Sequence, residues 1–472
     1  MNTKVLLIMP ALQKDKEYHH FPFGVLALAA SLEHIGISYD IFDERVTNPE
    51  SILDSIKNYS IVAISMFSGY QTYRGHYWLK TVRKYNPDAI TIAGGPHVSA
   101  TPEETANSPL VDYAIAGFAE NPFANLVLYI ASAKKRENAL NFQFPGVYSR
   151  NDNEDGIAIG MPTPKKYNDI QWAPIPYHKV DAQSYINPET RYVMYISQYG
   201  CPALCTFCAT PETRKWTSKP LNIVYEDLDK LKQLTNFDIL WFADATLFTN
   251  RKRALELIEH LDQNFIGDTW NADARAMELI RYSGEDLKKM RNCRMNLTKL
   301  VVGLESGSQV FVEKVIKKGK GHLRNFYEVA KNAYAANIDV LSGVIFGFPG
   351  ETINDLHETR KYISEIKKIH PNFEISTTFF RPLPGTDLYD TVREQGYLNI
   401  NSLEEWAEYG SKNHYEYNKW SNPPWFTKRE TKIYLEGYQH FMEEHGDICE
   451  ATTNNEGELG PERLELSLGI PT

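Results

Sequence analysis

The stretch YGCPALCTFC, residues 199–208, holds three cysteines within eight residues, with an aromatic side chain directly before the last one. Cys201, Cys205 and Cys208 are four and then three positions apart, and the whole chain has only five cysteines. This spacing would suit one face of a helix, but the neighbouring Gly200 and Pro202 favour a loop. We expect a loop that curls three thiolates around one object.

Length and composition limit what that object can be. The chain has 472 residues, of which 42% are apolar and 23% charged, which is typical of a folded globular protein with about two or three domains. Its net charge of −10 argues against a nucleic-acid partner bound through a basic surface. No apolar run approaches the roughly 18 residues that span a bilayer, and the N-terminal apolar run is too short for a signal peptide. We therefore expect a cytoplasmic protein with no membrane partner, in which thiols stay reduced.

In a reducing compartment, a tight cysteine cluster is more often a metal site than a disulfide framework. Structural zinc usually takes four ligands in paired short spacings, and the remaining Cys293 and Cys449 are isolated in the sequence. A four-iron cluster held by three cysteines leaves one iron open to a substrate or cofactor. The pattern favours such a cluster, with zinc or a disulfide as the alternatives.

Short apolar runs alternate with helical patterns over residues 1–145. Strands are expected at 4–10, 38–44, 60–67, 89–95 and 111–117, and a helix at 23–36. The runs are apolar throughout, as in parallel strands that are buried on both faces. They predict a doubly wound, Rossmann-like α/β domain, which would bind its ligand beyond the carboxyl ends of the strands.

A second strand–helix series follows a proline-rich segment, residues 146–190, which we interpret as a linker. Its strands are expected at 191–197, 238–244, 269–275, 299–307, 339–347 and 373–382. Six such units over residues 191–400 predict a partial (β/α)6 barrel with its active site at the carboxyl ends of the strands, where the cysteine loop lies. Residues 401–472 are predicted to form a helical, aromatic C-terminal extension and tail.

The cysteine pattern, at this place in the chain, resembles that of the radical S-adenosylmethionine (SAM) enzymes. The resemblance covers roughly residues 190–400 and includes the aromatic Phe207 before the last cysteine. In that family the three cysteines hold a 4Fe-4S cluster whose open iron chelates SAM. One electron then cleaves SAM and releases a 5′-deoxyadenosyl radical, which abstracts a hydrogen atom from the substrate.

Further motifs extend the resemblance along the barrel. GLESGSQ (303–309) resembles the fourth-strand segment, which implies that Glu305 and Ser306 contact the ribose or the methionine moiety. GVIFGFPGET (343–352) resembles the fifth-strand glycine motif, which implies that Ile345 packs on the adenine. Arg275 is a candidate partner for the methionine carboxylate. The Lys-rich KKGKGH (317–322) is interpreted as a solvated helix end.

The second barrel strand departs from the family pattern. Many relatives place a Gly-Gly-Glu there to hold the amino group of SAM, whereas this chain has WFADATLF (241–248). Asp244 lies at this strand end and is a candidate acid/base group or substrate contact. The alternative is a carboxylate that caps a helix or a turn. Which groups hold the amino group therefore stays open.

The first domain resembles the cobalamin-binding domain of the same enzymes, with ISMFSGYQ, GGPHVSATPEE and DYAIAGFAE in the family's order. The resemblance implies that Ser65 hydrogen-bonds cobalamin, and that Gly94 and Gly95 let the backbone approach the corrin. The Asp-x-His-x-x-Gly signature is missing, so we expect the cobalt to have no protein imidazole on the lower face of the corrin. Tyr70 or another side chain of the 66–71 loop is expected near that face instead. His97 is a further candidate contact, with a solvent-facing loop residue as the alternative.

His19 and His20 are interpreted as ordinary loop residues rather than cobalt ligands. A domain that kept this fold and lost its ligand would have much the same sequence. Cobalamin binding is therefore an expectation that follows from the resemblance.

The resemblance as a whole implies a cobalamin-dependent methyltransferase that uses a 4Fe-4S cluster, SAM and cobalamin. A flavodoxin- or ferredoxin-type protein would supply electrons, and the lack of an evident peptide-recognition domain favours a small-molecule substrate. One rival is a radical dehydratase, epimerase, cyclase or rearrangement enzyme whose first domain is a scaffold. Another is a non-catalytic iron–sulfur sensor or electron carrier, which would have no use for the motifs at 303–309 and 343–352.

Overall fold

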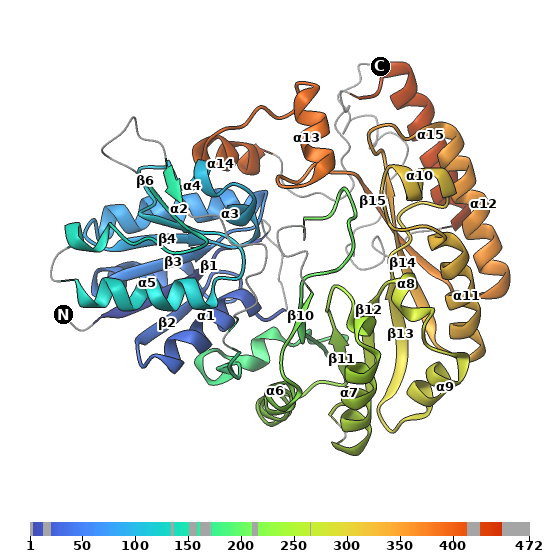
Figure 1. Ribbon diagram of the computed structural model, residues 1–472, viewed down its shortest axis with the longest axis horizontal. Coiled ribbons are helices and arrows are strands. Elements are labelled where there is room, and N and C mark those ends of the chain that lie inside the picture. Colours follow the sequence, from blue (N-terminus) through green and yellow to red (C-terminus); the bar gives the residue numbers. More distant parts are fainter. Residues whose placement is uncertain are drawn as a thin grey trace. The chain divides into compact units, whose positions relative to one another are not determined.

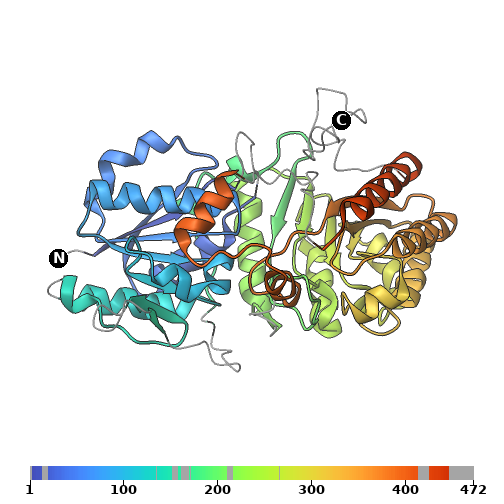
Figure 2. The same cartoon turned by 90° about the horizontal axis from the view of Figure 1, so that it is seen from above.

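The computed structural model describes residues 3–12, 20–133, 136–150, 158–160, 170, 172–209, 216–264, 266–412 and 425–445 (Figures 1 and 2). The chain divides into two compact units. The first unit comprises Met1–Val193, Thr217–Phe237 and Asn399–Tyr415, and the second comprises Met194–Trp216, Asp238–Leu398 and Glu416–Thr472. Among the residues that the structure describes, no helix is long and apolar enough to cross a membrane.

The first unit is built on a seven-stranded sheet with the order β2-β1-β3-β4-β5-β6-β7. Its parallel strands are β1 (Lys4–Met9), β2 (Ser38–Asp43), β3 (Ile61–Ser65), β4 (Ile90–Gly94) and β5 (Tyr113–Ile115). Strands β6 (Val147–Arg150) and β7 (Ala158–Gly160) extend one edge in antiparallel fashion. The predicted doubly wound α/β domain is confirmed.

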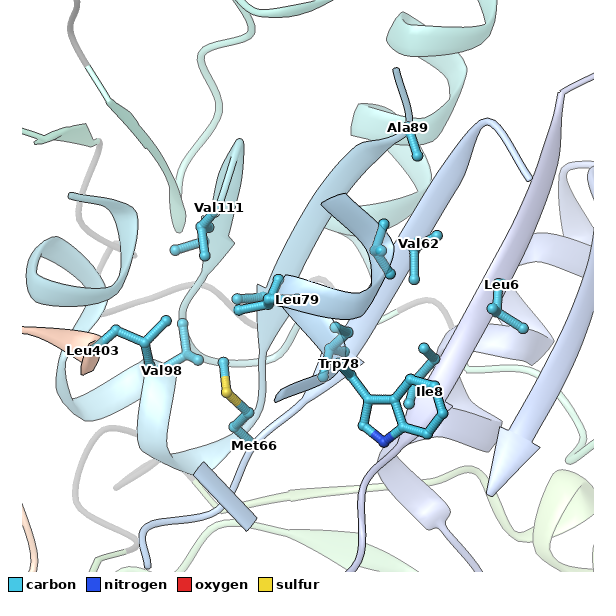
Figure 3. Packing of buried hydrophobic residues seen from close by; sticks show 14 of the residues in the cluster. Leu6, Ile8, Val62, Met66, Trp78, Leu79, Ala89, Val98, Val111 and Leu403 are labelled. Carbon is cyan, nitrogen blue, oxygen red and sulfur yellow. The ribbon is translucent and has the colours of Figure 1, made fainter. Parts of the chain in front are cut away.

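Strands β1, β3, β4 and β5 are almost wholly buried, which explains their mostly apolar sequences, whereas the edge strand β2 (SYDIFD) carries the exposed Ser38. Val5 and Leu7 of β1 pack on one side with α1 (Phe23–His34) and α5 (Glu120–Ser132). Leu6 and Ile8 pack on the other with η1 (Pro49–Asn58), α2 (Tyr70–Tyr85), α3 (Pro96–Ala100) and α4 (Pro102–Ala106). Figure 3 shows Trp78 and Leu79 of α2 and Val98 of α3 in this core. The first unit therefore has two hydrophobic cores, one on each face of the sheet.

The first unit also contains segments that were predicted to belong to the linker and to the C-terminal extension. Strands β6 and β7 belong to its sheet, although residues 146–190 were interpreted as a linker. Helix α14 (Leu403–Lys412), from the expected C-terminal extension, lies beside α2, and its Leu403 joins the core shown in Figure 3. The sequence of a short edge strand or of a single short helix does not show which sheet or helix it packs against, because that depends on residues elsewhere in the chain.

The second unit contains the six-stranded sheet β15-β14-β13-β12-β11-β8, which confirms the predicted partial barrel. Its strands are β8 (Tyr192–Tyr195), β11 (Ile239–Phe242), β12 (Thr269–Ala274), β13 (Asn296–Val302), β14 (Asp339–Phe346) and β15 (Glu374–Phe379). From β11 to β15, neighbouring strands are parallel. Along one side run α7 (Arg251–Asn264), α9 (Gly284–Asn292), α11 (His322–Ala335), α12 (Ile353–Ile369) and α15 (Lys428–His445), as Figure 1 shows.

Side chains alternate between the two faces of these barrel strands. In β14, Val340, Val344 and Phe346 are buried, whereas Leu341 and Ile345 are only partly buried. The first set faces the helices, so Ile345 faces the opposite, inner side of the sheet. Shorter elements complete the two units: η2 (Arg136–Ala139), η3 (Tyr177–Lys179), η4 (Ala182–Tyr185), β9 (Gln198–Tyr199), β10 (Thr217–Ser218), α6 (Leu221–Leu234), η6 (Leu247–Thr249), α8 (Ala276–Leu279), α10 (Gln309–Lys314) and α13 (Asp387–Glu394).

Candidate functional site

The segment that leads from β8 into the cysteine loop is anchored by Asp244. Its carboxylate accepts hydrogen bonds from the Ser197 amide (2.7 Å), the Ser197 hydroxyl (2.8 Å) and the Gln198 amide (2.7 Å). The side chain is fully buried, and this burial raises the pKa of Asp244 to about 6. The prediction of an acid/base group or substrate contact was wrong, because these oxygens are committed to the loop and have no exposed surface.

The cysteine loop is also held at its far end. The Thr206 amide donates to the Ile316 carbonyl (3.1 Å), and the Thr206 hydroxyl donates to the Val315 carbonyl (2.7 Å). The Thr206 carbonyl in turn accepts from the Leu388 amide (3.0 Å). The loop is therefore fixed both before its first cysteine and between its second and third.

The three cysteines of the loop lie half-buried between these anchors. Of the four cysteines in the described residues, the three in the loop and Cys293, none forms a disulfide. Among the described residues, no three His, Cys, Asp or Glu side chains form a site for a single metal ion. A 4Fe-4S cluster does not require that arrangement, since its cysteines bind different irons. Three thiols on one anchored, accessible loop fit a cluster better than they fit zinc.

Two cations lie close enough to the cysteines to act on their sulfurs. Burial raises the pKa of the Cys205 thiol, and the charges of Lys318 and Arg275 oppose that rise. Burial likewise raises the pKa of the Cys201 thiol, and Arg275 again opposes it. Because metal ligands must be thiolates, cations at this place favour the ligating form.

Lys318 is the residue of this site that sequence reasoning missed. Its segment was interpreted as a solvated helix end, but Lys317 (φ 56°) and Gly319 (φ 113°) have left-handed backbone conformations, and the side chain between them is buried. Lys318 is only 5% exposed, and its Nζ lies 2.7 Å from Glu305 Oε1. A Cβ at Gly303 would lie 2.7 Å from that Nζ, so the first glycine of GLESGSQ makes room for the ion pair. Gly303 is therefore the feature of the sequence that could have indicated a buried side chain beside Glu305.

Glu305 is held by its backbone as well as by Lys318. Its φ of 66° is a left-handed conformation that costs a non-glycine residue about 1–3 kcal/mol. Its amide donates to the Gly343 carbonyl (2.9 Å), and its carbonyl accepts from the Ile345 amide (3.0 Å). The end of β13 is thereby tied to β14, which brings Glu305 and Ile345 to the same edge of the barrel.

The side chains of Arg275 and Ser306 lie in different surroundings. Arg275 donates to Glu278 Oε1 (2.8 Å) and to the Lys318 carbonyl (3.3 Å), so it belongs to the same polar cluster as the cysteines. Ser306 is fully buried, and its hydroxyl lies 3.0 Å from the Thr359 hydroxyl of α12. The prediction that Ser306 contacts the cofactor was wrong, since its side chain holds β13 to a helix.

Phe207 links the cysteine loop to the glycine motif after β14. Its ring meets that of Phe348 edge-on, with 5.5 Å between ring centroids. Phe348 follows Gly347 in the GFPG segment, residues 347–350. The predicted site residues therefore converge at the carboxyl ends of the barrel strands. They are the cysteine loop, Arg275, Glu305, Ile345 and the GFPG segment.

In the first unit, the residues predicted to touch cobalamin gather at the carboxyl ends of β3 and β4. The Met66 amide donates to the Gly94 carbonyl (2.8 Å), which joins the two loops. Gly95 has a φ of 99°, and a Cβ there would lie 2.7 Å from the Met66 carbonyl oxygen and 2.9 Å from Ser65 Oγ. Gly95 is therefore required by the protein's own close packing. Tyr70 begins α2 at the same edge and is partly buried.

His97 is a core residue rather than a ligand contact or a solvent-facing residue. It is fully buried in α3, with Nδ1 at 3.0 Å from the Ser68 hydroxyl and Nε2 at 3.4 Å from the Thr101 hydroxyl. Trp406 of α14 covers its ring, with centroids 5.2 Å apart. Burial lowers the pKa of His97 to about 3. The prediction of a cofactor contact was wrong, because a ring enclosed on all sides has no surface to offer.

Other histidines and cysteines of interest lie away from the site. His20 Nε2 lies 3.4 Å from the Tyr192 hydroxyl, which fits a loop residue with a protein partner. His19 and Cys449 lie outside the described residues.

Two families match separate parts of the chain. Residues 195–363 match the radical SAM superfamily, and residues 14–127 match the B12 binding domain. The first range contains the three cysteines, Glu305 and the GFPG segment. The second contains β1 to β5, with Ser65, Gly94 and Gly95 at the strand ends.

Several known proteins align across both ranges. An uncharacterized methyltransferase of Pyrococcus horikoshii is 25% identical over 400 residues, which are 82% of each chain. The bacteriochlorophyllide d C-8(2)-methyltransferase of Chlorobaculum tepidum is 24% identical over 356 residues, or 74% of this chain and 71% of the relative.

A solved structure shares the fold. The radical S-adenosylmethionine methyltransferase TsrM of Kitasatospora setae, with cobalamin and a [4Fe-4S] cluster bound, superposes with a TM-score of 0.65 over 84% of this chain and 75% of that chain, at 15% identity. Together with the converging cysteine loop and motifs, these matches show that the chain contains a radical SAM domain over residues 195–363 and a domain of the B12-binding family over residues 14–127.

Proposed function

We propose that the chain is a cobalamin-dependent methyltransferase that methylates an unactivated carbon of a small molecule. The observation that carries this proposal is the alignment with methyltransferases across both units, over 82% of each chain in one case. A radical domain alone would serve many reactions, whereas a B12-type domain in the same chain supplies a place for a methyl carrier.

Residues of the second unit can hold the cluster and SAM. Cys201, Cys205 and Cys208 are the cluster ligands. Arg275 has N–H donors beyond those that bond Glu278 and Lys318, and these suit the carboxylate of methionine. The cluster would supply the electron that cleaves SAM, and the role of the chain is to hold the cluster and to orient SAM beside it.

Glu305 and Ile345 would bind the adenosyl end of SAM. Glu305 is fixed by its backbone and by Lys318, so its carboxylate is already oriented before the cofactor arrives. Ile345 offers an apolar side chain on the inner face of β14. Preorganisation of this kind lowers the cost of binding.

The first unit would hold cobalamin, which carries the methyl group, at the carboxyl ends of β3 and β4. Ser65 offers a hydroxyl there, and among the described residues beyond its chain neighbours the atom nearest to a Cβ at Gly94 would be the Ile115 carbonyl oxygen, 3.8 Å away. That open space permits a close approach of a large, flat ligand. Gly95 and His97 act in the protein's own packing, so the contact falls to Ser65, Gly94 and Tyr70.

Partners follow from this chemistry. Cleavage of SAM consumes an electron, so an external one-electron donor is required, and a small flavodoxin- or ferredoxin-type protein suits the task. A cytoplasmic location suits cysteines that must remain reduced.

The two soluble products derived from SAM test the proposal. Purified protein with a low-potential reductant, SAM and a substrate-containing extract should form both S-adenosylhomocysteine, from methyl donation, and 5′-deoxyadenosine, from reductive cleavage. Cys205→Ala should form no 5′-deoxyadenosine, whereas Cys293→Ala, the matched control outside the loop, should form it normally. If 5′-deoxyadenosine forms without any S-adenosylhomocysteine, a radical enzyme with a scaffold domain replaces the methyltransferase.

A further inference from the structure

We propose that the C-terminal segment Trp425–Phe441 positions the GFPG segment, residues 347–350, and so sets the affinity of the radical SAM domain for the adenosyl end of its cofactor. Trp425 and Tyr434 are the positioning residues. The inference rests on the proposed function in one respect, since the adenosyl role of this motif follows from the family resemblance. The contacts themselves lie within the second unit.

Both backbone groups of Gly347 are bound by the C-terminal segment. Its amide donates to the Tyr434 hydroxyl (3.1 Å), and its carbonyl accepts from Trp425 Nε1 (3.0 Å). Gly347 has a φ of 78°, a left-handed conformation that glycine adopts readily. The turn after β14 is thus fixed by residues about 80 positions later in the chain.

Tyr434 reaches the other end of the same loop through Glu351. The Glu351 carboxylate accepts from the Gly347 amide (2.7 Å) and the Phe348 amide (3.1 Å), and it is hydrogen-bonded to Tyr434. Both side chains are almost fully buried. Loss of the Tyr434 hydroxyl would remove one hydrogen-bond partner of the Glu351 carboxylate. Glu351 is buried, and a buried polar group without a hydrogen-bond partner is destabilising.

Aromatic contacts extend this link to the cysteine loop. Trp425 packs edge-on against Phe380 (5.8 Å between centroids), and Phe380 packs against Phe348 (4.9 Å). Phe348 in turn meets Phe207, the residue before Cys208. A displacement of Trp425 would therefore act on a ring that contacts the cysteine loop.

The segment is docked closely enough to act as a support. Helix α15 runs beside α12, as Figures 1 and 2 show, and a Cβ at Gly437 would lie 2.6 Å from Leu356 Cδ2 of that helix. Tyr438 and Phe441 pack on Phe346 at the end of β14, with centroids 5.1 and 5.0 Å apart. Residues 425–445 of the extension are thus packed on the barrel, while residues 446–472 lie outside the described part of the chain.

A matched pair of variants on α15 tests the inference. Tyr434→Phe removes the hydroxyl that holds Gly347 and Glu351. Tyr438→Phe removes a hydroxyl of the same helix that lies 3.1 Å from the Thr377 hydroxyl of β15. Tyr434→Phe should speed amide hydrogen exchange in peptides covering 347–352 of the cofactor-free protein and weaken SAM binding to the cluster-loaded protein about tenfold. Tyr438→Phe should change neither.

Equal exchange and equal SAM affinity in the two variants would overturn the inference, because helix packing alone would then be at work. If Tyr434→Phe fails to fold, Trp425→Phe gives the same test through the Gly347 carbonyl from a less buried position. A wild-type protein that binds no SAM would instead refute the proposed function. The exchange result would then still decide whether the segment holds the loop.

Discussion

Lys318 and Glu305 show how one residue pair organises the barrel edge. The pair is almost fully buried, and its members come from the segment after α10 and the segment after β13. Breaking a buried pair by removing one partner is typically destabilising by about 3–5 kcal/mol, because the other charge is left without compensation. The two residues therefore support each other, and Glu305 is in place before the cofactor binds.

Glu305→Ala should weaken SAM binding while the cluster still assembles. A hydrogen bond to a charged group is worth about 1.5–3 kcal/mol, which corresponds to a tenfold to hundredfold loss of affinity. Equilibrium binding of SAM to the cluster-loaded variant measures this. Glu328→Ala, a half-exposed carboxylate on α11, is the control and should bind normally. Unchanged affinity in the Glu305 variant would mean that this carboxylate does not face the cofactor.

His97 should make the first unit sensitive to acid. Its pKa is about 3 in the folded protein and about 6.5 in an unfolded chain, so folding favours the neutral ring. Its contribution is present above pH 6.5 or so and is lost as the pH falls, by up to about 1.4 kcal/mol for each pH unit down to about 3.

Calorimetry near pH 7.5 and near pH 5.5 measures the effect. The wild-type melting temperature should fall more between these conditions than that of His97→Gln, whose side chain does not titrate. An equal fall in the two proteins would contradict the account.

Errors at the residue scale share one physical cause. Asp244 was predicted as a site residue from its place at a strand end, His97 and Ser306 were predicted from motifs of the family resemblance, and Lys318 was predicted to be solvated because of its neighbours. Position along a strand can be inferred from the sequence. The direction of a single side chain depends on partners such as Ser197, Trp406 and Thr359, which come from distant segments.

At the scale of elements, α14 is the helix whose location the sequence concealed. It belongs to the first unit, where Trp406 Nε1 donates to Glu104 (2.9 Å) and the Ser108 hydroxyl donates to Glu404 (2.6 Å). The strands, by contrast, could be predicted to within about five residues, because each is a short, largely apolar run between helical patterns. The sequence of a helix of about three turns does not show which sheet the helix covers.

Gly410 should be required for the docking of α14. A Cβ at this position would lie 2.2 Å from the Gly69 carbonyl oxygen at the start of α2, whereas a Cβ at Gly24 of α1 would meet none of the described residues within 4 Å. Gly410→Ala should therefore destabilise the first unit by about 1–3 kcal/mol. Gly24→Ala should be neutral or stabilise it by up to about 1 kcal/mol, since alanine favours a helix. Shifts in melting temperature of the same sign and size in both variants, relative to the wild-type protein, would contradict this packing.

At the scale of the whole molecule, the chain combines two α/β units with separate tasks. Both the first unit's sheet and the barrel could be predicted from strand–helix alternation, and the cysteine loop identified the chemistry of the second. The tasks of the first unit were harder to predict, because a Rossmann-like sheet with glycine-rich strand ends suits many ligands. The B12-family match over residues 14–127 narrows that choice.

The absorption spectrum of the protein, purified without oxygen from cobalamin-supplied cells, tests the central claim most directly. The account predicts the broad absorbance of an iron–sulfur cluster together with the sharper bands of a corrin. In Cys205→Ala, the cluster absorbance should disappear and the corrin bands should remain, since the two groups are held by different units. Cluster absorbance without corrin bands in the wild-type protein would contradict the account, because the first unit would then bind no cobalamin.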